Sequence, residues 1–135
     1  MHPNIKHLLT PKFFLALAIL STVTIIVGSM VTVDLQPDLE IKISDKFMHA
    51  IAYFFLSGLW FLALLPQRGY TLKNVSLIAL LVFFYGIIIE VLQGAFTHTR
   101  EADLYDILAN FVGVVIAGVL TLVFIKSKIT PKAKK

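Results

Sequence analysis

Polar side chains with acid–base chemistry recur at helical spacing in three apolar stretches of this sequence. They form three sets: His49 and Tyr53; Glu90 and Gln93; and Asp103, Asp106 and Asn110. Within each set the spacing places the residues on one face of an α-helix. An imidazole, carboxylates, amides and a phenol brought together can exchange protons or bind a polar ligand.

Glu90 is the residue among them that most needs a functional explanation. A carboxylate in the last turn of a helix faces the negative end of the helix dipole, and this one also borders hydrocarbon. We expect it to have a partner among Lys46, His49 and Arg100. If the site is catalytic, His49 is the candidate general base and Glu90 the candidate acid, while Arg100 would stabilise developing negative charge.

Taken singly, the other members have structural explanations. Asp103 is placed to cap the helix that follows it, and Asp106 to lie in its first turn, where the helix dipole favours carboxylates. A capping role is likewise expected for Ser44 or Asp45 at the helix that contains His49. The functional interpretation therefore depends on the three sets lying together.

Composition places these residues in a membrane protein. The chain of 135 residues is 58% hydrophobic and only 15% charged, with a mean hydropathy of +0.86, which excludes an ordinary soluble domain. It has no cysteine, which excludes disulfides and thiolate catalysis. The net charge of +4 resides in short flanks beside apolar runs, as expected for contact with anionic lipid headgroups rather than with nucleic acid.

Four apolar runs predict an all-α fold, a polytopic membrane protein with a four-transmembrane-helix bundle. The predicted helices span about residues 13–33, 47–65, 75–93 and 104–125, and Pro66 is expected to end the second. They make up one membrane domain, 13–125, between an N-terminal flank, 1–12, and a basic tail, 126–135. The first run is expected to persist as a helix rather than to be cleaved as a signal peptide, because it is long and no A-x-A-like site follows it.

The charges predict how the bundle is oriented. All eight acidic residues lie between positions 34 and 45 or between 90 and 106, whereas most of the 12 basic residues lie elsewhere. By the positive-inside rule the N-terminus, the loop around Arg68 and the C-terminus are cytoplasmic. The polar sets would then meet at the outer end of the bundle.

Two further features predict contacts between helices. Ala109, Gly113 and Ala117 recur every four residues, a small-residue stripe that is expected to serve packing within the chain rather than dimerisation. Tyr85 lies within an apolar run and is expected to hydrogen-bond to a neighbouring helix.

Three motifs in order resemble those of the VanZ-like family. They are Asp45-Lys46-x-x-His49-x-x-x-Tyr53-Phe54; Gly86-x-x-x-Glu90-x-x-Gln93; and Arg100-Glu101-Ala102-Asp103-x-x-Asp106-x-x-Ala109-Asn110-x-x-Gly113. The resemblance covers residues 45 to about 118 and implies a small multi-pass protein of the bacterial cytoplasmic (inner) membrane. It also implies a link to the cell envelope and to glycopeptide (teicoplanin) resistance. The family's reaction is poorly defined, so the resemblance indicates a place and a set of residues more than an activity.

The first functional hypothesis is an outer-leaflet pocket that binds, or acts on, a cell-envelope molecule such as a lipid headgroup, a lipid-linked precursor or a peptidoglycan precursor. Lys46 and Arg100, with two helix N-termini, would hold a phosphate. The expected ligand-binding residues are Lys46, Tyr53, Gln93, Asp103, Asp106 and Asn110. Whether the site is enzymatic stays open.

Three other interpretations compete with it. The alternative is a non-enzymatic accessory module that docks a partner membrane protein, with the polar network structural. Ion transport fits less well, because no ionisable relay crosses the core. No cofactor or metal is expected; a divalent cation held by His49, Glu90, Asp103 and Asp106 is the less favoured variant.

Overall fold

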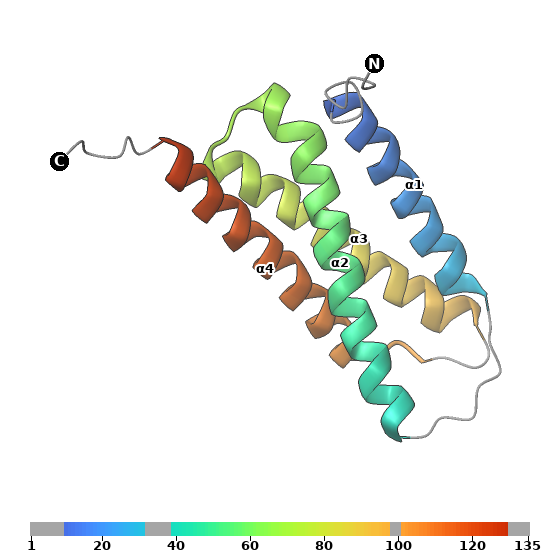
Figure 1. The fold of residues 1–135 in the computed structure, drawn as a ribbon. Helices are drawn as coiled ribbons and strands as arrows, with labels where there is room; N and C mark the ends of the chain where they lie inside the picture. The colour runs from blue at the N-terminus through green and yellow to red at the C-terminus, as the bar shows by residue number, and fades with distance from the viewer. Residues whose placement is uncertain (1–9, 32–38, 98–100, 130–135) are drawn as a thin grey trace, which may run out of the picture.

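The computed structural model describes residues 10–31, 39–97 and 101–129, and it is all-α (Figure 1). The helices are α1 (Pro11–Met30), α2 (Leu39–Arg68), α3 (Leu72–Phe96) and α4 (Leu104–Ile129). The predicted four-helix fold is therefore confirmed. The helix boundaries differ from the predicted ones mainly in α2, which begins at Leu39 rather than at Phe47.

The helix starts follow from short capping sequences. Thr10 accepts a hydrogen bond from the Phe13 N–H, and Pro11 occupies the first turn, where its missing N–H costs nothing. Thr71 caps α3 in the same way by accepting from the Asn74 N–H. The two capped helices, α1 and α3, begin at the same end of the bundle.

Pro66 does not end α2, contrary to the sequence-based expectation. The helix passes through it to Arg68, because the proline ring fixes φ at about −65°, a helical value, and the missing N–H costs a single hydrogen bond. Gly69 ends the helix instead: it has φ +95°, and its N–H donates to the Leu65 carbonyl at 2.9 Å. A glycine adopts this left-handed conformation without strain, so it makes a better helix stop than the proline.

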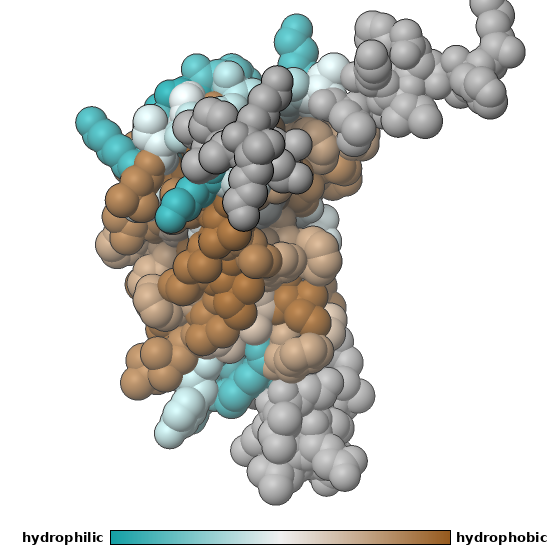
Figure 2. Space-filling model, turned by 60° about the vertical axis from the view of Figure 1, so that its left-hand side comes forward, coloured by the Kyte–Doolittle hydropathy of each residue, from teal (hydrophilic) through white to brown (hydrophobic). Residues whose placement is uncertain are grey.

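Each helix contains a segment long and apolar enough to cross a membrane. These segments are Pro11–Met30, Asp45–Arg68, Leu72–Phe96 and Leu104–Ser127. Many large apolar side chains, such as Leu20, Phe55, Leu81 and Phe124, are exposed on the bundle surface. Figure 2 shows a hydrophobic band with more hydrophilic residues at both ends, as expected for a protein whose middle faces lipid.

The helices alternate in direction, so the C-terminal ends of α1 and α3 lie at the same end of the bundle as the N-terminal ends of α2 and α4 (Figure 1). Helix α2 packs against α1, α3 and α4, and the buried core includes Leu56 and Leu65 of α2, Ile78 of α3 and Val114 of α4. The three predicted polar sets thus lie at one end, as their positions in the sequence required.

Gly113 brings the backbones of α2 and α4 into direct contact. A Cβ built on it would overlap the Ala50 carbonyl oxygen and would lie 2.9 Å from the Phe54 nitrogen. No side chain fits there, so glycine is required for this approach. The small-residue stripe therefore serves contact within the chain at this position, and it does so one residue from His49.

Candidate functional site

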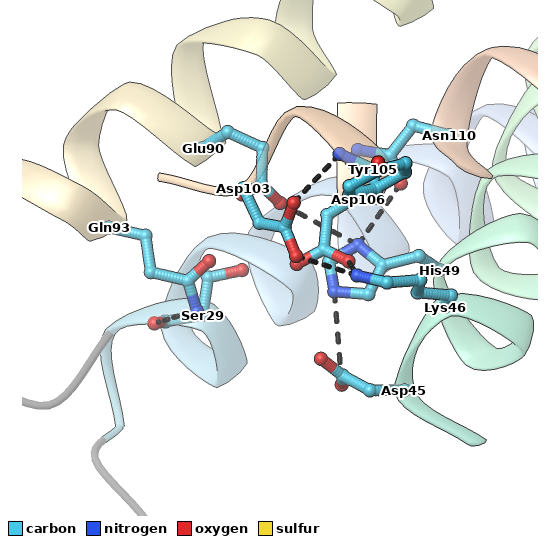
Figure 3. A network of polar contacts seen from close by, with 10 residues as sticks. All are labelled: Ser29, Asp45, Lys46, His49, Glu90, Gln93, Asp103, Tyr105, Asp106 and Asn110. Atoms are coloured by element: carbon cyan, nitrogen blue, oxygen red, sulfur yellow. Dashed lines mark hydrogen bonds and ion pairs between the residues drawn. The ribbon is translucent and has the colours of Figure 1, made fainter. Parts of the chain in front are cut away.

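The three polar sets form one cluster at the shared end of α2, α3 and α4 (Figure 3). Helix α2 contributes Asp45, Lys46 and His49; α3 contributes Glu90; and α4 contributes Asp106 and Asn110, with Asp103 just before it. Glu90 and Asn110 are each only 1% exposed. The cluster therefore takes charge into the interior, where it has to be compensated.

Lys46 joins two carboxylates of the α4 end. Its Nζ lies 2.6 Å from Asp103 Oδ2 and 2.9 Å from Asp106 Oδ1, and it lies 5.5 Å from the centre of the Tyr105 ring. Asp103 Oδ1 also accepts from the Tyr105 N–H at 2.8 Å, so the predicted capping role of Asp103 is confirmed. The Lys46 ammonium therefore binds the two carboxylates at the start of α4.

His49 has hydrogen-bond acceptors around its Nδ1. Asn110 Oδ1 lies 3.1 Å and Glu90 Oε1 3.6 Å from this nitrogen. Because amide and carboxylate oxygens only accept, the arrangement assigns a hydrogen to Nδ1. The other ring nitrogen, Nε2, lies 3.9 Å from Asp45 Oδ1, so a carboxylate lies near each nitrogen of the ring.

His49 is one of the three partners expected for Glu90, and its Nδ1 lies 3.6 Å from Glu90 Oε1. Lys46 is hydrogen-bonded to Asp103 and Asp106, and Arg100 lies outside the described residues. The predicted roles of Arg100 in charge stabilisation and phosphate binding therefore concern a residue that the structure does not place. Glu101 is exposed.

Asp45 and Ser44 do not cap α2, contrary to expectation, because the helix already begins at Leu39. Lys46 and His49 accordingly lie beyond the first turn of α2. The positive end of the α2 dipole does not act on them, since that effect falls off within one turn. The phosphate site was expected to use the N-termini of two helices, and the N-terminus of α2 is not available to it.

Some buried polar atoms make no hydrogen bond with the residues that the structure describes. They include the Tyr53 hydroxyl, Ser57 Oγ and Asn110 Nδ2. Tyr53 is 2% exposed, and its ring lies against Gly86, where a Cβ would come within 2.8 Å of Cε1. Sequence reasoning missed Ser57, although it follows Tyr53 by one helical turn and shares its face.

Helix α1 also contributes to this end of the bundle, which the sequence did not indicate. Gln93 Nε2 donates to the Ser29 carbonyl at 3.2 Å (Figure 3). Deeper in the bundle, the Tyr85 hydroxyl donates to the Thr22 carbonyl at 2.6 Å, which confirms its predicted contact with another helix. Backbone carbonyls leave no sequence signal, because every residue has one.

A pocket of about 370 Å³ lies between α1, α2 and α3 beside the cluster. It is polar where Ser29, Asp45, His49 and Gln93 line it. One turn deeper, its walls include Ile25, Ala52, Tyr53 and Ile89. The pocket therefore presents charged groups next to apolar surface.

The carboxylates and the imidazole could in principle hold a cation. Within the described part of the chain, Asp45, His49 and Asp106 bring one ligand atom each within 4.8 Å of one another. This group includes Asp45 in place of the Glu90 and Asp103 of the expected set. The Lys46 ammonium already neutralises part of the charge, since it contacts both Asp103 and Asp106.

Fold and site together define a multi-pass α-helical membrane protein with a partly buried charged cluster at one end of the bundle. No family model, no curated protein and no solved structure matches the chain.

Proposed function

We propose that this protein is a VanZ-like protein of the bacterial inner membrane that binds an amphiphilic cell-envelope molecule in the pocket between α1, α2 and α3. The charged cluster would lie at the outer leaflet, as the positive-inside rule predicts. The head of the ligand would contact Asp45, His49 and Gln93, and its apolar part would lie against Ile25 and Ile89. Lys46, Asp103, Asp106 and Asn110 would hold these head-binding residues in place.

One observation carries the proposal: the pocket joins a charged end to an apolar wall beside the helices' lipid-facing surfaces. Ligand sites typically combine mostly apolar walls with a few placed polar groups. A lipid or a lipid-linked precursor has the same division between head and chain. A soluble polar metabolite would leave the apolar wall unused.

Binding is tested by filling the pocket. We expect the wild type to retain a bound amphiphile through purification. Ala52 lines the pocket, so Ala52→Phe should expel this molecule. The matched control is Ala16→Phe, which adds the same side chain at an exposed position of α1. Native mass spectrometry of the purified proteins should show loss of bound mass for Ala52→Phe alone; equal occupancy in both variants would contradict the pocket.

If the protein also acts on its ligand, the geometry favours His49 as the base. Its Nδ1–H faces Asn110 and Glu90, which leaves Nε2 as the nitrogen that takes a proton. Glu90 is 1% exposed and would then orient the imidazole rather than serve as the acid. Equal turnover of a labelled lipid-linked precursor by wild type and His49→Ala would remove the catalytic role.

A link to glycopeptide susceptibility follows from the resemblance of the three motifs. Expression of the chain in a susceptible Gram-positive host should raise the teicoplanin concentration needed to stop growth. His49→Ala should abolish the effect, provided that both proteins accumulate equally. No change with the wild type would limit the proposal to ligand binding.

The alternative, an accessory module with a structural network, is supported by the bridge from Lys46 to Asp103 and Asp106. Polar contacts between membrane helices are commonly structural and are each worth about 1 kcal/mol or less. The two functions differ in what Glu90→Ala and Asp106→Ala do. Loss of folded protein in both would favour the structural role, whereas normal folding with lost ligand would favour the pocket.

A further inference from the structure

A second pocket lies deeper in the bundle, between the same three helices. We call it the deep pocket, and we call the pocket of about 370 Å³ beside His49 the head pocket. The deep pocket has a volume of about 200 Å³ and is lined by Thr22, Leu56, Trp60, Leu64, Ile78, Leu81, Val82 and Tyr85. On each helix, lining residues of the two pockets lie about one turn apart: Ile25 and Thr22, Tyr53 and Leu56, Ile89 and Tyr85. The deep pocket therefore continues the line of the head pocket toward the middle of the bundle.

Side chains that meet at Thr22 of α1 separate the two pockets. The Tyr85 hydroxyl donates to the Thr22 carbonyl at 2.6 Å, so the Tyr85 side chain crosses from α3 to α1. The Trp60 Nε1–H of α2 donates to the Thr22 hydroxyl at 3.3 Å. The Tyr53 ring, which lines the head pocket, has its centre 6.4 Å from the centre of the Tyr85 ring. Tyr85 and its neighbours thus form a partition between the pockets.

The partition limits how deep a chain can extend from the head pocket. Gln93, at the polar end of this pocket, makes the other bond from α3 to α1 described above, to the Ser29 carbonyl. Gln93 and Tyr85 are eight residues apart, which is about 12 Å along a helix. Half of a hydrocarbon core is about 15 Å thick. A chain that stops at Tyr85 therefore stays within the half of the membrane next to the cluster.

The Tyr85 side chain is the part of the partition that a substitution can remove. Its hydrogen bond holds the ring in place, because an unpaired hydroxyl among apolar side chains would be costly. Beyond the ring, the deep pocket is lined mainly by apolar side chains such as Leu56, Ile78 and Val82. Removal of the ring would therefore give an alkyl chain an apolar path into the deep pocket.

We infer that Tyr85 determines the chain length of the ligand by closing the head pocket at the level of Thr22. The inference rests on the proposed function and deepens it, because it names the ligand as an amphiphile whose chain ends before Tyr85. A longer chain would have to bend out between α1 and α3 and would lose contact with the pocket walls.

The test uses two monoacylglycerols with the same uncharged head, monooctanoylglycerol and monohexadecanoylglycerol. They are offered together to the full chain at equal mole fraction in micelles of a neutral maltoside detergent. Native mass spectrometry then measures the ratio of the two bound masses. We expect wild type to favour the octanoyl probe by at least about tenfold, because additional methylenes do not fit a filled pocket without strain.

The key variant is Tyr85→Ala, which removes the partition and joins the two pockets. The ratio should shift by at least about tenfold toward the hexadecanoyl probe. Tyr85→Phe keeps the ring and loses only the hydroxyl, so it should shift the ratio less. The matched control is Phe84→Ala, which removes a ring at an exposed position outside both pockets and should leave the ratio unchanged.

A second substitution distinguishes a path for the chain from a general loosening of the bundle. Leu64 lines the deep pocket, so adding Leu64→Trp to Tyr85→Ala should fill the path and restore the preference for the octanoyl probe. Leu62→Trp adds the same side chain at an exposed position of α2 outside both pockets. In the Tyr85→Ala background it should not restore the preference.

The outcomes separate the role of Tyr85 from the existence of the head pocket. Equal binding of both probes to wild type, or an unchanged ratio in Tyr85→Ala, overturns the inference, as does restoration by Leu62→Trp. The proposed function survives these results if Ala52→Phe abolishes binding of both probes, and it fails if Ala52→Phe leaves both bound. Should Tyr85→Ala not fold, Tyr85→Leu, which removes the outer half of the ring, should shift the ratio in the same direction; no shift overturns the inference.

Discussion

The imidazole of His49 has a carboxylate near each ring nitrogen, and this arrangement depends on three helices. Asp45 is on its own helix, Glu90 on α3, and Asn110 on α4 fixes the hydrogen on Nδ1. The residue types and their shared faces could be predicted from spacing. Their pairing could not, because Glu90 had several possible partners and only the packing of α2 against α3 and α4 selects His49.

Tyr53→Phe tests whether the phenolic hydroxyl serves the ligand or the fold. The hydroxyl has no hydrogen-bond partner among the described residues, so removing it should leave the free energy of unfolding unchanged or raise it by up to about 1 kcal/mol. Because Tyr53 lines the pocket, the variant should retain less of the bound amphiphile than the wild type. Unfolding in mixed detergent micelles and native mass spectrometry measure the two effects; a clear loss of stability would assign the hydroxyl to the fold.

Lys46→Met should destabilise the protein by leaving two carboxylates close together. The Asp106 side chain is 11% exposed, but the Lys46 side chain is 35% exposed, so we expect about 1–2 kcal/mol rather than the larger cost of a fully buried pair. Asp106→Asn in the same chain should restore part of the loss. Unfolding of the single and double variants measures this coupling, and additive effects would contradict the bridge.

At the scale of the helices, hydropathy predicted the four apolar spans, because the lipid environment demands uninterrupted apolar runs. It did not predict where α2 begins, since polar residues alternate with apolar ones between Leu39 and Ser44 and hydropathy assigns only the membrane-spanning part. It was also wrong about Pro66, because the local consequence of a proline depends on its distance from the helix end. The stripe of small residues on α4, by contrast, correctly indicated a close contact.

Gly113→Ala should separate α2 from α4. The added methyl would overlap the Ala50 carbonyl oxygen, so the backbones must move apart, at an expected cost of about 1–3 kcal/mol. Gly118→Ala is the matched control, because its Cβ would lie 3.9 Å from Val75 Cγ1, an ordinary contact. Unfolding should show a loss in the first variant and none in the second; equal stability would contradict the close approach.

At the scale of the whole molecule, the charge distribution and the alternating direction of the helices assign the acidic residues to the same end of the bundle. The end that carries the cluster is the end rich in acidic residues, and the opposite end carries Arg68 and Lys73. This orientation follows from loop charges, which act during insertion and leave no trace in helix packing. It therefore stays a prediction that labelling has to test.

The chain contains no cysteine, so single cysteines report its orientation without a background. Glu101→Cys should react with a membrane-impermeant maleimide added to intact cells, because position 101 is exposed beside the cluster. Tyr70→Cys, at the exposed turn between α2 and α3, should react only after the cells are opened. The reverse pattern would place the cluster on the cytoplasmic side.

Helix α2 has 30 residues and is about 45 Å long, against about 30 Å for a hydrocarbon core. Its N-terminal turns extend past the neighbouring helices (Figure 1), while the contact between Ala50 and Gly113 fixes it to α4. The contact between Ala50 and Gly113 is therefore the fixed point about which this end of α2 can tilt. Because His49 lies next to that point and Asp45 lies one turn toward the overhang, a tilt would displace Asp45 more than His49.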